Sequence, residues 1–206
     1  MADTTRFTPA EVAFLLHESV RAVTKALDRG PVRPVLQARP GASIRMIDWA
    51  DLFYLFAVKA LREDLTPRAR AEFYEAVRRA RIEQTDEVRF GRFRVAVADI
   101  VDEVKKRVAE LAELRNKVMF APDGKAVLDS RGVAVHRIAA LLNGGLSVNA
   151  VLEEYPSLSR EAVETAYFYA HIWPKPGRPY PRTTANRAMR DDGSAEPDEL
   201  PFDEDG

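Results

Sequence analysis

The apolar residues follow helical spacing over most of the chain, and capping residues and prolines divide them into short segments. Thr8 and Glu11 form a capping box with a proline at the first helical position, which predicts a helix over residues 9–16. Ser19 is placed to cap a second helix over residues 20–28. The chain is therefore expected to open with two short helices joined by a tight turn.

A hairpin and a very apolar helix are expected next. Short apolar runs at residues 35–38 and 43–47 flank a Pro-Gly turn and predict a β-hairpin in the position of a wing. Asp48 is expected to cap the helix WADLFYLFAVKAL, which is too short to span a membrane. A helix this apolar must be buried on most sides, either in a core or in a dimer.

Residues 65–130 predict alternating helices and hairpins. Helices are expected over residues 67–82 and, after a cap at Asp99, up to residue 115, with hairpins at residues 87–97 and 117–128. The second helix carries an apolar stripe of near-heptad spacing at Val101, Val104, Val108, Leu111 and Leu114. This stripe indicates a core face, with dimer packing as the second interpretation.

The remaining helical pattern predicts a small bundle. Helices are expected over residues 135–142, 148–155 and 160–173, the last two capped by Ser147 and Ser159. Three short helices with tight turns form a helix-turn-helix-like bundle. The expected fold is mainly α with short β-hairpins. Four parts are expected. Residues 1–64 form a winged helix-turn-helix and residues 65–130 a middle segment. Residues 131–174 form a three-helix domain, and residues 175–206 are a disordered tail.

The last helical segment carries motifs of a known family. These are an apolar entry at residues 133–138, a Gly-x-Ser turn at 145–147, a Glu-Glu-Tyr-Pro-x-Leu link at 153–158 and a tyrosine-rich last helix. With them the segment resembles the domain of unknown function 433 family, and a weaker similarity reaches back over residues 86–128. The resemblance implies an antitoxin of VapB type that is paired with a PIN-like ribonuclease toxin. Many members carry Gly-Thr-Arg-Ile-Pro-Val where this chain has Ser-Arg-Gly-Val-Ala-Val, so no role of that threonine or proline carries over.

The opening of the chain has a second resemblance. Thr-Pro-x-Glu-Val-Ala at residues 8–13 and Ser-Val-Arg followed by Gly at residues 19–30 are similar to the first two helices of MerR/excisionase-like winged helices. On that interpretation the second helix enters a major groove, where Arg21 and Lys25 contact bases or phosphates. An ordinary solvated helix face is the alternative. The candidate DNA-binding residues are Ser19, Arg21, Lys25, Arg29, Arg33, Arg39 and Arg45.

The net charge of −1 for 206 residues hides an asymmetry. Residues 191–206 contain eight acidic residues and no basic one; without these eight of 32 acids, 24 remain against 31 basic residues, a net charge of +7. A basic body suggests a polyanionic partner, and the acidic tail either competes with that partner or only aids solubility.

The tail is also the expected toxin contact. PIN-type ribonucleases, the partner that the family resemblance implies, hold a metal ion with clustered carboxylates. Arginines in an extended proline-rich segment can pair with such carboxylates in bidentate fashion. The candidate toxin-binding residues are Arg178, Arg182, Arg187, Arg190, Leu200 and Phe202.

Little in the sequence indicates catalysis. The chain has no cysteine, no phosphate-binding glycine loop and no paired zinc ligands, so no enzymatic activity, metal or cofactor is expected. The expected function is that of a cytoplasmic, homodimeric type II antitoxin, which neutralises a PIN-like ribonuclease and represses its own operator. The alternatives are a MerR-like regulator without a toxin and an interaction module that does not bind DNA.

Overall fold

The structure, a computed structural model, describes residues 5–39, 42–129, 131–175, 177 and 180–183. In this part the chain is mainly α-helical with short antiparallel β-hairpins, which confirms the predicted fold class. The chain divides into two compact units, Met1–Asn116 (unit 1) and Lys117–Gly206 (unit 2). Each unit is described by itself.

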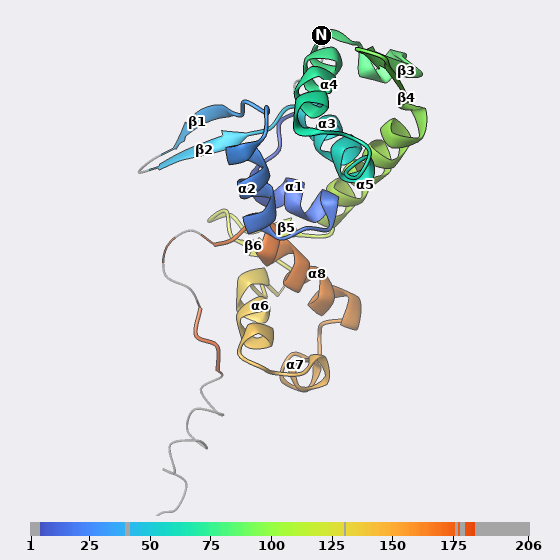
Figure 1. Cartoon of the computed structure of the whole chain (residues 1–206). Coiled ribbons are helices and arrows are strands. Elements are labelled where there is room, and N and C mark those ends of the chain that lie inside the picture. The colour runs from blue at the N-terminus through green and yellow to red at the C-terminus, as the bar shows by residue number, and fades with distance from the viewer. Residues whose placement is uncertain (1–4, 40–41, 130, 176, 178–179, 184–206) are drawn as a thin grey trace, which may run out of the picture. The chain divides into compact units, whose positions relative to one another are not determined.

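Unit 1 opens with helices α1, Pro9–Leu16, and α2, Val20–Arg29 (Figure 1). The predicted capping box is present: the Thr8 backbone N–H donates to Glu11 Oε2 (2.7 Å) and the Glu11 N–H donates to Thr8 Oγ1 (3.3 Å). Ser19 caps α2 by accepting from the Ala22 N–H (3.1 Å). Both helices therefore begin where the side-chain chemistry predicts.

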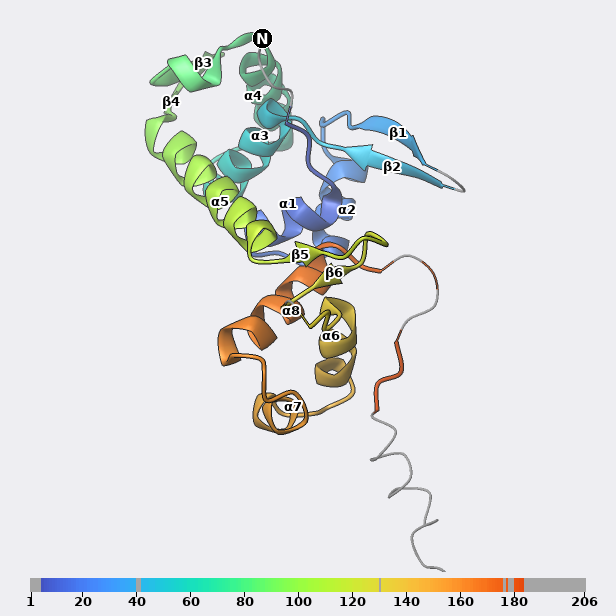
Figure 2. The same ribbon diagram turned by 180° about the vertical axis from the view of Figure 1, so that it is seen from behind.

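The first hairpin follows α2. Strands β1, Val35–Arg39, and β2, Ala42–Met46, pair antiparallel with Val35 opposite Met46. The backbones of Phe7 and Ile47 exchange two hydrogen bonds of 2.8 Å, which fixes the base of the hairpin beside the start of α1. The hairpin projects from the helices next to α2 (Figures 1 and 2).

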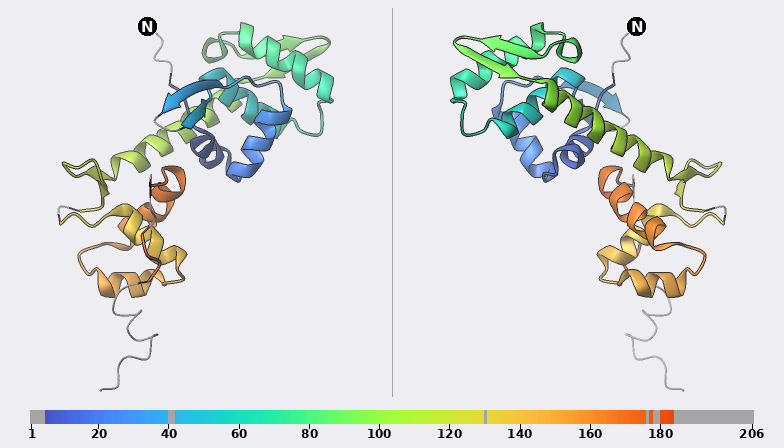
Figure 3. Two further views of the ribbon diagram at one scale, coloured as in Figure 1. Left: turned by 90° about the vertical axis from the view of Figure 1, so that its left-hand side faces the viewer. Right: turned by 90° about the vertical axis from the view of Figure 1, so that its right-hand side faces the viewer.

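Two helices follow the first hairpin, α3 (Trp49–Ala60) and α4 (Pro67–Arg79), and then a 3-10 turn (Ile82–Gln84). A second hairpin, β3 (Glu87–Phe90) and β4 (Phe93–Ala96), leads into the long helix α5 (Ala98–Asn116) (Figure 3). Two boundaries differ from the prediction. Helix α4 ends at Arg79 because Ala80 is extended (ψ 149°), and Asp99 lies within the first turn of α5 instead of preceding it.

The core of unit 1 uses the apolar residues of α3 and α5. Leu52, Phe53 and Ala57 have no exposed surface, and α3 packs on both α4 and α5. On α5 the buried positions are Val101, Val104 and Leu111, so the near-heptad stripe is a core face. The expected boundary near residue 64 does not divide two units, because this packing joins residues before and after it.

Unit 2 begins with the last hairpin, β5, Met119–Phe120, and β6, Ala126–Val127. Helices α6, Val135–Asn143, α7, Val148–Glu154, and α8, Arg160–Ile172, follow, and Ser147 and Ser159 cap α7 and α8 as predicted (Figure 1). A single core joins them through fully buried side chains at Ile138, Leu141, Val151, Val163 and Ala166. Among the described helices, none has the length and apolar character that crossing a membrane requires.

Candidate nucleic-acid interface

The outward face of α2 carries three cations. Arg21, Lys25 and Arg29 recur at intervals of four residues, and all three are exposed. Val23 and Leu27, on the opposite side of the helix, are buried and hold α2 against the rest of unit 1. Side chains four apart lie one above another on a helix, so the three cations form one stripe that faces away from the core. We call it the α2 cationic stripe.

The α2 cationic stripe keeps its charge. In the part of the chain that the structure describes, none of its three residues forms an ion pair. The one acidic residue of α2, Asp28, is paired with Arg45 of β2, with 2.5 Å between Asp28 Oδ1 and Arg45 Nη1. The nearest carboxylate on the helix is therefore already neutralised, and the stripe presents a net positive surface to solvent.

The remaining predicted DNA-binding residues make other contacts, or their side chains lie outside the described part of the chain. Arg45 is half-exposed and joins the hairpin to α2 through its ion pair with Asp28. The Arg33 guanidinium donates to the carbonyls of Gly30 (3.2 Å) and Val32 (3.3 Å). Arg39 ends β1, but its side chain lies outside the described part. Ser19 acts as the helix cap. The structure thus gathers Arg21, Lys25 and Arg29 on one face and does not bring Arg33 or Arg45 to it as free cations.

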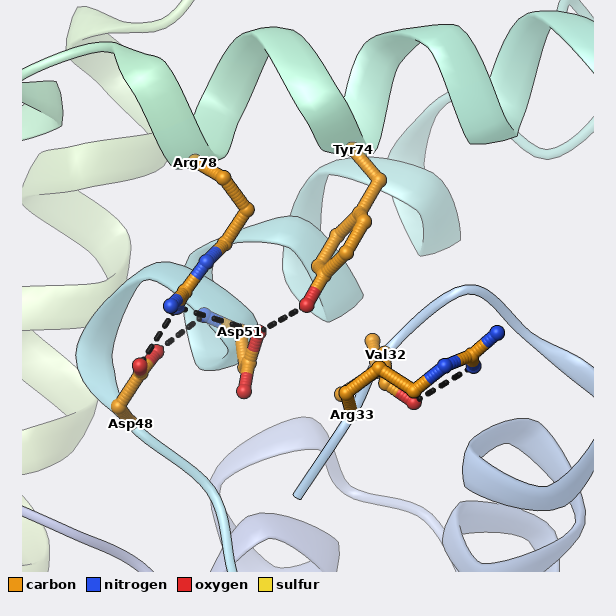
Figure 4. Close-up of polar contacts among 6 residues, drawn as sticks. All are labelled: Val32, Arg33, Asp48, Asp51, Tyr74 and Arg78. Atoms are coloured by element: carbon orange, nitrogen blue, oxygen red, sulfur yellow. Dashed lines mark hydrogen bonds and ion pairs between the residues drawn. The ribbon is translucent and has the colours of Figure 1, made fainter. Parts of the chain in front are cut away.

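A polar cluster with two buried members, Asp51 and Tyr74, lies between the start of α3 and α4 (Figure 4). Asp48 caps α3 by accepting from the Asp51 N–H (2.9 Å), and Asp51 is only 3% exposed. The Tyr74 hydroxyl donates to Asp51 Oδ1 (2.9 Å), while Arg78 Nη1 lies 2.5 Å from Asp48 Oδ2 and 3.6 Å from Asp51 Oδ1. We call these four residues the α3–α4 polar cluster. It joins the start of α3 to the C-terminal half of α4.

Burial is the largest influence on the pKa values of Asp51 and Tyr74 in the polar cluster. It raises the pKa of Asp51, and the charge of Asp48 raises it further, while Tyr74 and Arg78 act in the opposite direction. Burial and the hydrogen bond to Asp51 raise the pKa of Tyr74 to about 12, against a smaller lowering by a hydrogen bond from the Arg33 backbone. The cluster therefore also touches the chain that leads into β1. Sequence reasoning did not find it, although an aspartate inside so apolar a helix is a signal that a partner must exist.

Most of the predicted toxin contacts lie outside the described residues: Arg178, Arg187, Arg190, Leu200 and Phe202. Arg182 is described and exposed, and its backbone passes over Gly144 at the end of α6. The Arg137 guanidinium donates to the carbonyls of Pro181 (2.8 Å) and Thr183 (3.3 Å). Residues 180–183, expected to belong to a disordered tail, thus contact α6.

The described residues were also compared with the ligand sets that hold metal ions. Among the described residues there is no group of three histidine, aspartate or glutamate side chains placed to hold a metal ion. His17 follows α1, His136 lies in α6 and His171 in α8, so the fold brings no three such ligands together around them.

The comparison with known families concerns unit 2. Residues 122–170 match the family "Protein of unknown function (DUF433)". The match is about a quarter of the chain and runs from the turn of the last hairpin into α8, which confirms the family resemblance of this module. No curated protein and no solved structure shows a significant match to the chain. The VapB identity and the winged-helix resemblance of the N-terminal segment remain predictions.

Proposed function

We propose that unit 1 binds duplex DNA through α2 and the β1–β2 hairpin, and that the protein is an antitoxin that represses its own operator. The observation that carries the DNA-binding proposal is the α2 cationic stripe, three exposed cations without an ion-pair partner among the described residues. Cations that neutralise phosphates release bound counterions, and this release supplies much of the affinity of such complexes.

The arrangement of elements supports a groove-binding geometry. Helices α1 and α2 are joined by a three-residue turn, and the β1–β2 hairpin follows in the place of a wing. In helix-turn-helix proteins the first turn of the second helix reaches base edges. Here that turn exposes Arg21, which can bind guanine in bidentate fashion, and Val20, which is 45% exposed and can contact a thymine methyl group. Lys25 and Arg29, further along, suit phosphate contacts.

The antitoxin role rests on the family match of unit 2 and on the tail. A PIN-like ribonuclease remains the proposed partner, with arginines of the tail entering its acidic metal site. The proposed homodimer has lost its original motivation, because α3 and the α5 stripe are buried inside unit 1. It now rests on the pseudo-palindromic sites that helix-turn-helix readers recognise as dimers.

Fluorescence anisotropy with the DNA upstream of the gene tests the DNA-binding proposal. Arg21→Ala with Lys25→Ala removes two cations of the stripe and is expected to weaken binding at least about tenfold and to reduce the salt dependence. The matched control is Arg68→Ala with Arg79→Ala, which removes the same charge from α4, where each arginine is paired with a glutamate four residues away. An equal loss of affinity in the two double variants would contradict the assignment of α2.

A truncation tests the toxin contact separately. Ending the chain after Thr183 keeps the contacts of residues 180–183 with α6 and removes the acidic segment with Arg187, Arg190, Leu200 and Phe202. The expected result is loss of co-purification with a PIN-like protein that a neighbouring gene is expected to encode, with DNA binding retained. A truncated chain that still inhibits the nuclease would move the toxin site into the folded units. A neighbourhood without such a nuclease, combined with specific DNA binding, would favour the MerR-like regulator.

A further inference from the structure

Unit 2 contains a pocket of about 330 Å³ that the proposed DNA contact does not use. It lies between the β5–β6 hairpin, the start of α6, the end of α8 and the chain that follows α8. Four aromatic side chains line it: Phe120, Tyr169, Trp173 and Tyr180. We call it the aromatic pocket. The DUF433 match covers only part of its lining, since Trp173 and Tyr180 lie beyond residue 170.

Ring contacts and one hydrogen bond hold Tyr169 and Trp173 in the aromatic pocket. The Tyr169 ring lies 4.7 Å from the Trp173 ring between centroids, and the His136 ring meets Tyr169 edge-on at 6.1 Å. His136 Nε2 lies 2.7 Å from the Trp173 carbonyl oxygen, to which it donates a hydrogen bond, and this contact fixes the end of α8. Phe120 is different: it is 57% exposed, and among the described aromatic contacts its ring is stacked on no other. It offers a free stacking surface at the mouth.

The charges of the pocket favour an anionic ligand. Lys125 and Lys175 contribute two positive charges, and Asp123 contributes one negative charge. Asp123 is engaged, with 2.5 Å between its Oδ2 and Lys125 Nζ, and this pair raises the pKa of Lys125. Lys175 Nζ lies 4.6 Å from the centroid of the Tyr180 ring. A planar ligand with a negative group nearby is therefore accommodated, whereas a guanidinium or ammonium group would meet like charge.

One wall of the pocket is set by a backbone contact on α6. Arg137 holds residues 181–183 through two carbonyl oxygens, and a Cβ built at Gly144 would overlap the Arg182 carbonyl oxygen and come within 2.8 Å of Arg182 Cβ. The glycine thus lets this segment, which we call the α6 strap, lie directly on the helix end. Because Tyr180 immediately precedes the strap, its ring and the Lys175 ammonium group stay at the pocket.

We propose that the aromatic pocket binds one unpaired nucleotide of a single-stranded nucleic acid. The base stacks against Phe120 and Trp173, and Lys175 faces its phosphate while Lys125 stays paired with Asp123. Stacking on aromatic side chains beside cations is the general means by which proteins hold single strands. The site goes beyond the proposed duplex contact, because it belongs to unit 2 and uses no residue of α2. RNA and DNA share this chemistry, so the two sources are separated by experiment.

Binding is measured with the full chain, using fluorescein-labelled oligouridine and oligothymidine and the quenching of Trp173 in a Trp49→Phe background, which leaves Trp173 as the single tryptophan. Phe120→Ala is expected to weaken binding about tenfold or more. Lys175→Ala should weaken it several-fold and lower the salt dependence. The matched control Phe168→Ala removes an aromatic ring that is 49% exposed on α8 and outside the pocket, and it should stay within twofold of the parent.

Gly144→Ala tests the α6 strap without altering the pocket lining. At φ −83° and ψ 0° this position accepts any residue, so an alanine acts only by pushing the strap away. A several-fold loss of single-strand affinity with an unchanged circular dichroism spectrum is expected. Tighter binding of oligouridine would identify RNA as the ligand, and tighter binding of oligothymidine would identify DNA.

The duplex-binding proposal and the pocket proposal can be contradicted independently of each other. Phe120→Ala should leave duplex affinity unchanged, and Arg21→Ala with Lys25→Ala should leave single-strand affinity unchanged. Absence of saturable binding by either oligonucleotide overturns the pocket proposal, as does a Phe120→Ala variant that binds like the parent. A Phe120→Ala variant that loses the nuclease partner but no oligonucleotide affinity would assign the pocket to a protein ligand instead.

Discussion

Helices α2 and α4 of unit 1 both carry arginines, but among the described residues three of the four arginines of α4 pair with carboxylates, whereas those of α2 do not. The fourth, Arg70, donates to the Arg62 carbonyl (2.6 Å). On α4, Arg68 pairs with Glu72 at 2.9 Å, Arg79 with Glu75 at 3.7 Å, and Arg78 reaches Asp48 of α3 at 2.5 Å. On α2, no described carboxylate pairs with the cationic stripe, and Asp28 is held by Arg45. The same residue type is thus part of an ion pair on one helix and available to a ligand on the other.

The difference shows that partners, and not the number of cations, decide where a polyanion binds. Exposed pairs four residues apart add little stability, about 0.3–0.5 kcal/mol each, but they cancel the local field. The ion-paired arginines of α4 are therefore poor candidates for phosphate contact, although α4 carries more arginines than α2. This contrast can be tested by removing cations of each kind.

The largest effect on folding is expected from Arg78→Ala. The variant leaves the buried Asp51 without its nearby cation and removes the partner of Asp48, so the free energy of unfolding should fall by about 1–3 kcal/mol. Arg21→Ala, on the α2 stripe, should change it by about 0.5 kcal/mol or less. Urea titrations in a Trp173→Phe background, where Trp49 reports on unit 1, measure both. Equal changes would show that the paired and unpaired cations do not differ in the way proposed.

A pH series sharpens the same contrast at Asp51. Burial raises the pKa of Asp51 in the folded state above its ordinary value of 3.8, so the folded state binds this proton more tightly than the unfolded state does. The stability that Asp51 contributes is full below the unfolded pKa and is lost as the pH rises through the folded pKa. The unfolding free energy of the parent relative to Asp51→Asn should therefore fall as the pH rises from below 3.8 through the raised pKa of Asp51 in the folded state. A difference between the parent and Asp51→Asn that stays flat over the pH series would contradict the assigned cause.

Local chemistry made most of the elements predictable. Thr8, Ser19 and Asp48 cap the helices that follow them, because a cap needs only a side chain and an amide three residues away. The outward face of α2 follows equally from the spacing of its apolar residues. Unit boundaries did not follow, since they depend on α3 packing against α5, which lies far along the chain.

Pairing across long sequence separations also escaped prediction. Tyr74 and Asp51 are 23 residues apart, and Arg45 and Asp28 are 17 apart, so no periodic pattern links them. That is why the sequence did not predict the ion pair by which Arg45 joins the hairpin to α2. The aromatic pocket was missed for the same reason, because its lining comes from the hairpin, α6, α8 and the chain beyond α8.

The smallest predicted effect concerns the Asp28–Arg45 pair, which separates the two kinds of cation within one site. Asp28→Ala removes the one acid of α2 and frees Arg45, so duplex DNA affinity should rise a few-fold. Arg45→Ala leaves Asp28 unpaired beside the stripe, and affinity should fall a few-fold. The double variant should return near the parent, because it removes one charge of each sign. Both side chains are about half-exposed, so unfolding free energies should change by about 1 kcal/mol at most.

Anisotropy titrations at two salt concentrations measure these three variants. Asp28→Ala should steepen the salt dependence if the freed Arg45 reaches a phosphate. The opposite outcome, a weaker affinity in both single variants and in the double variant, would mean that the pair acts by holding the hairpin in place. Arg45 would then be a positioning residue whose geometry matters more than its charge, and the contrast between paired and unpaired cations would not extend to the wing.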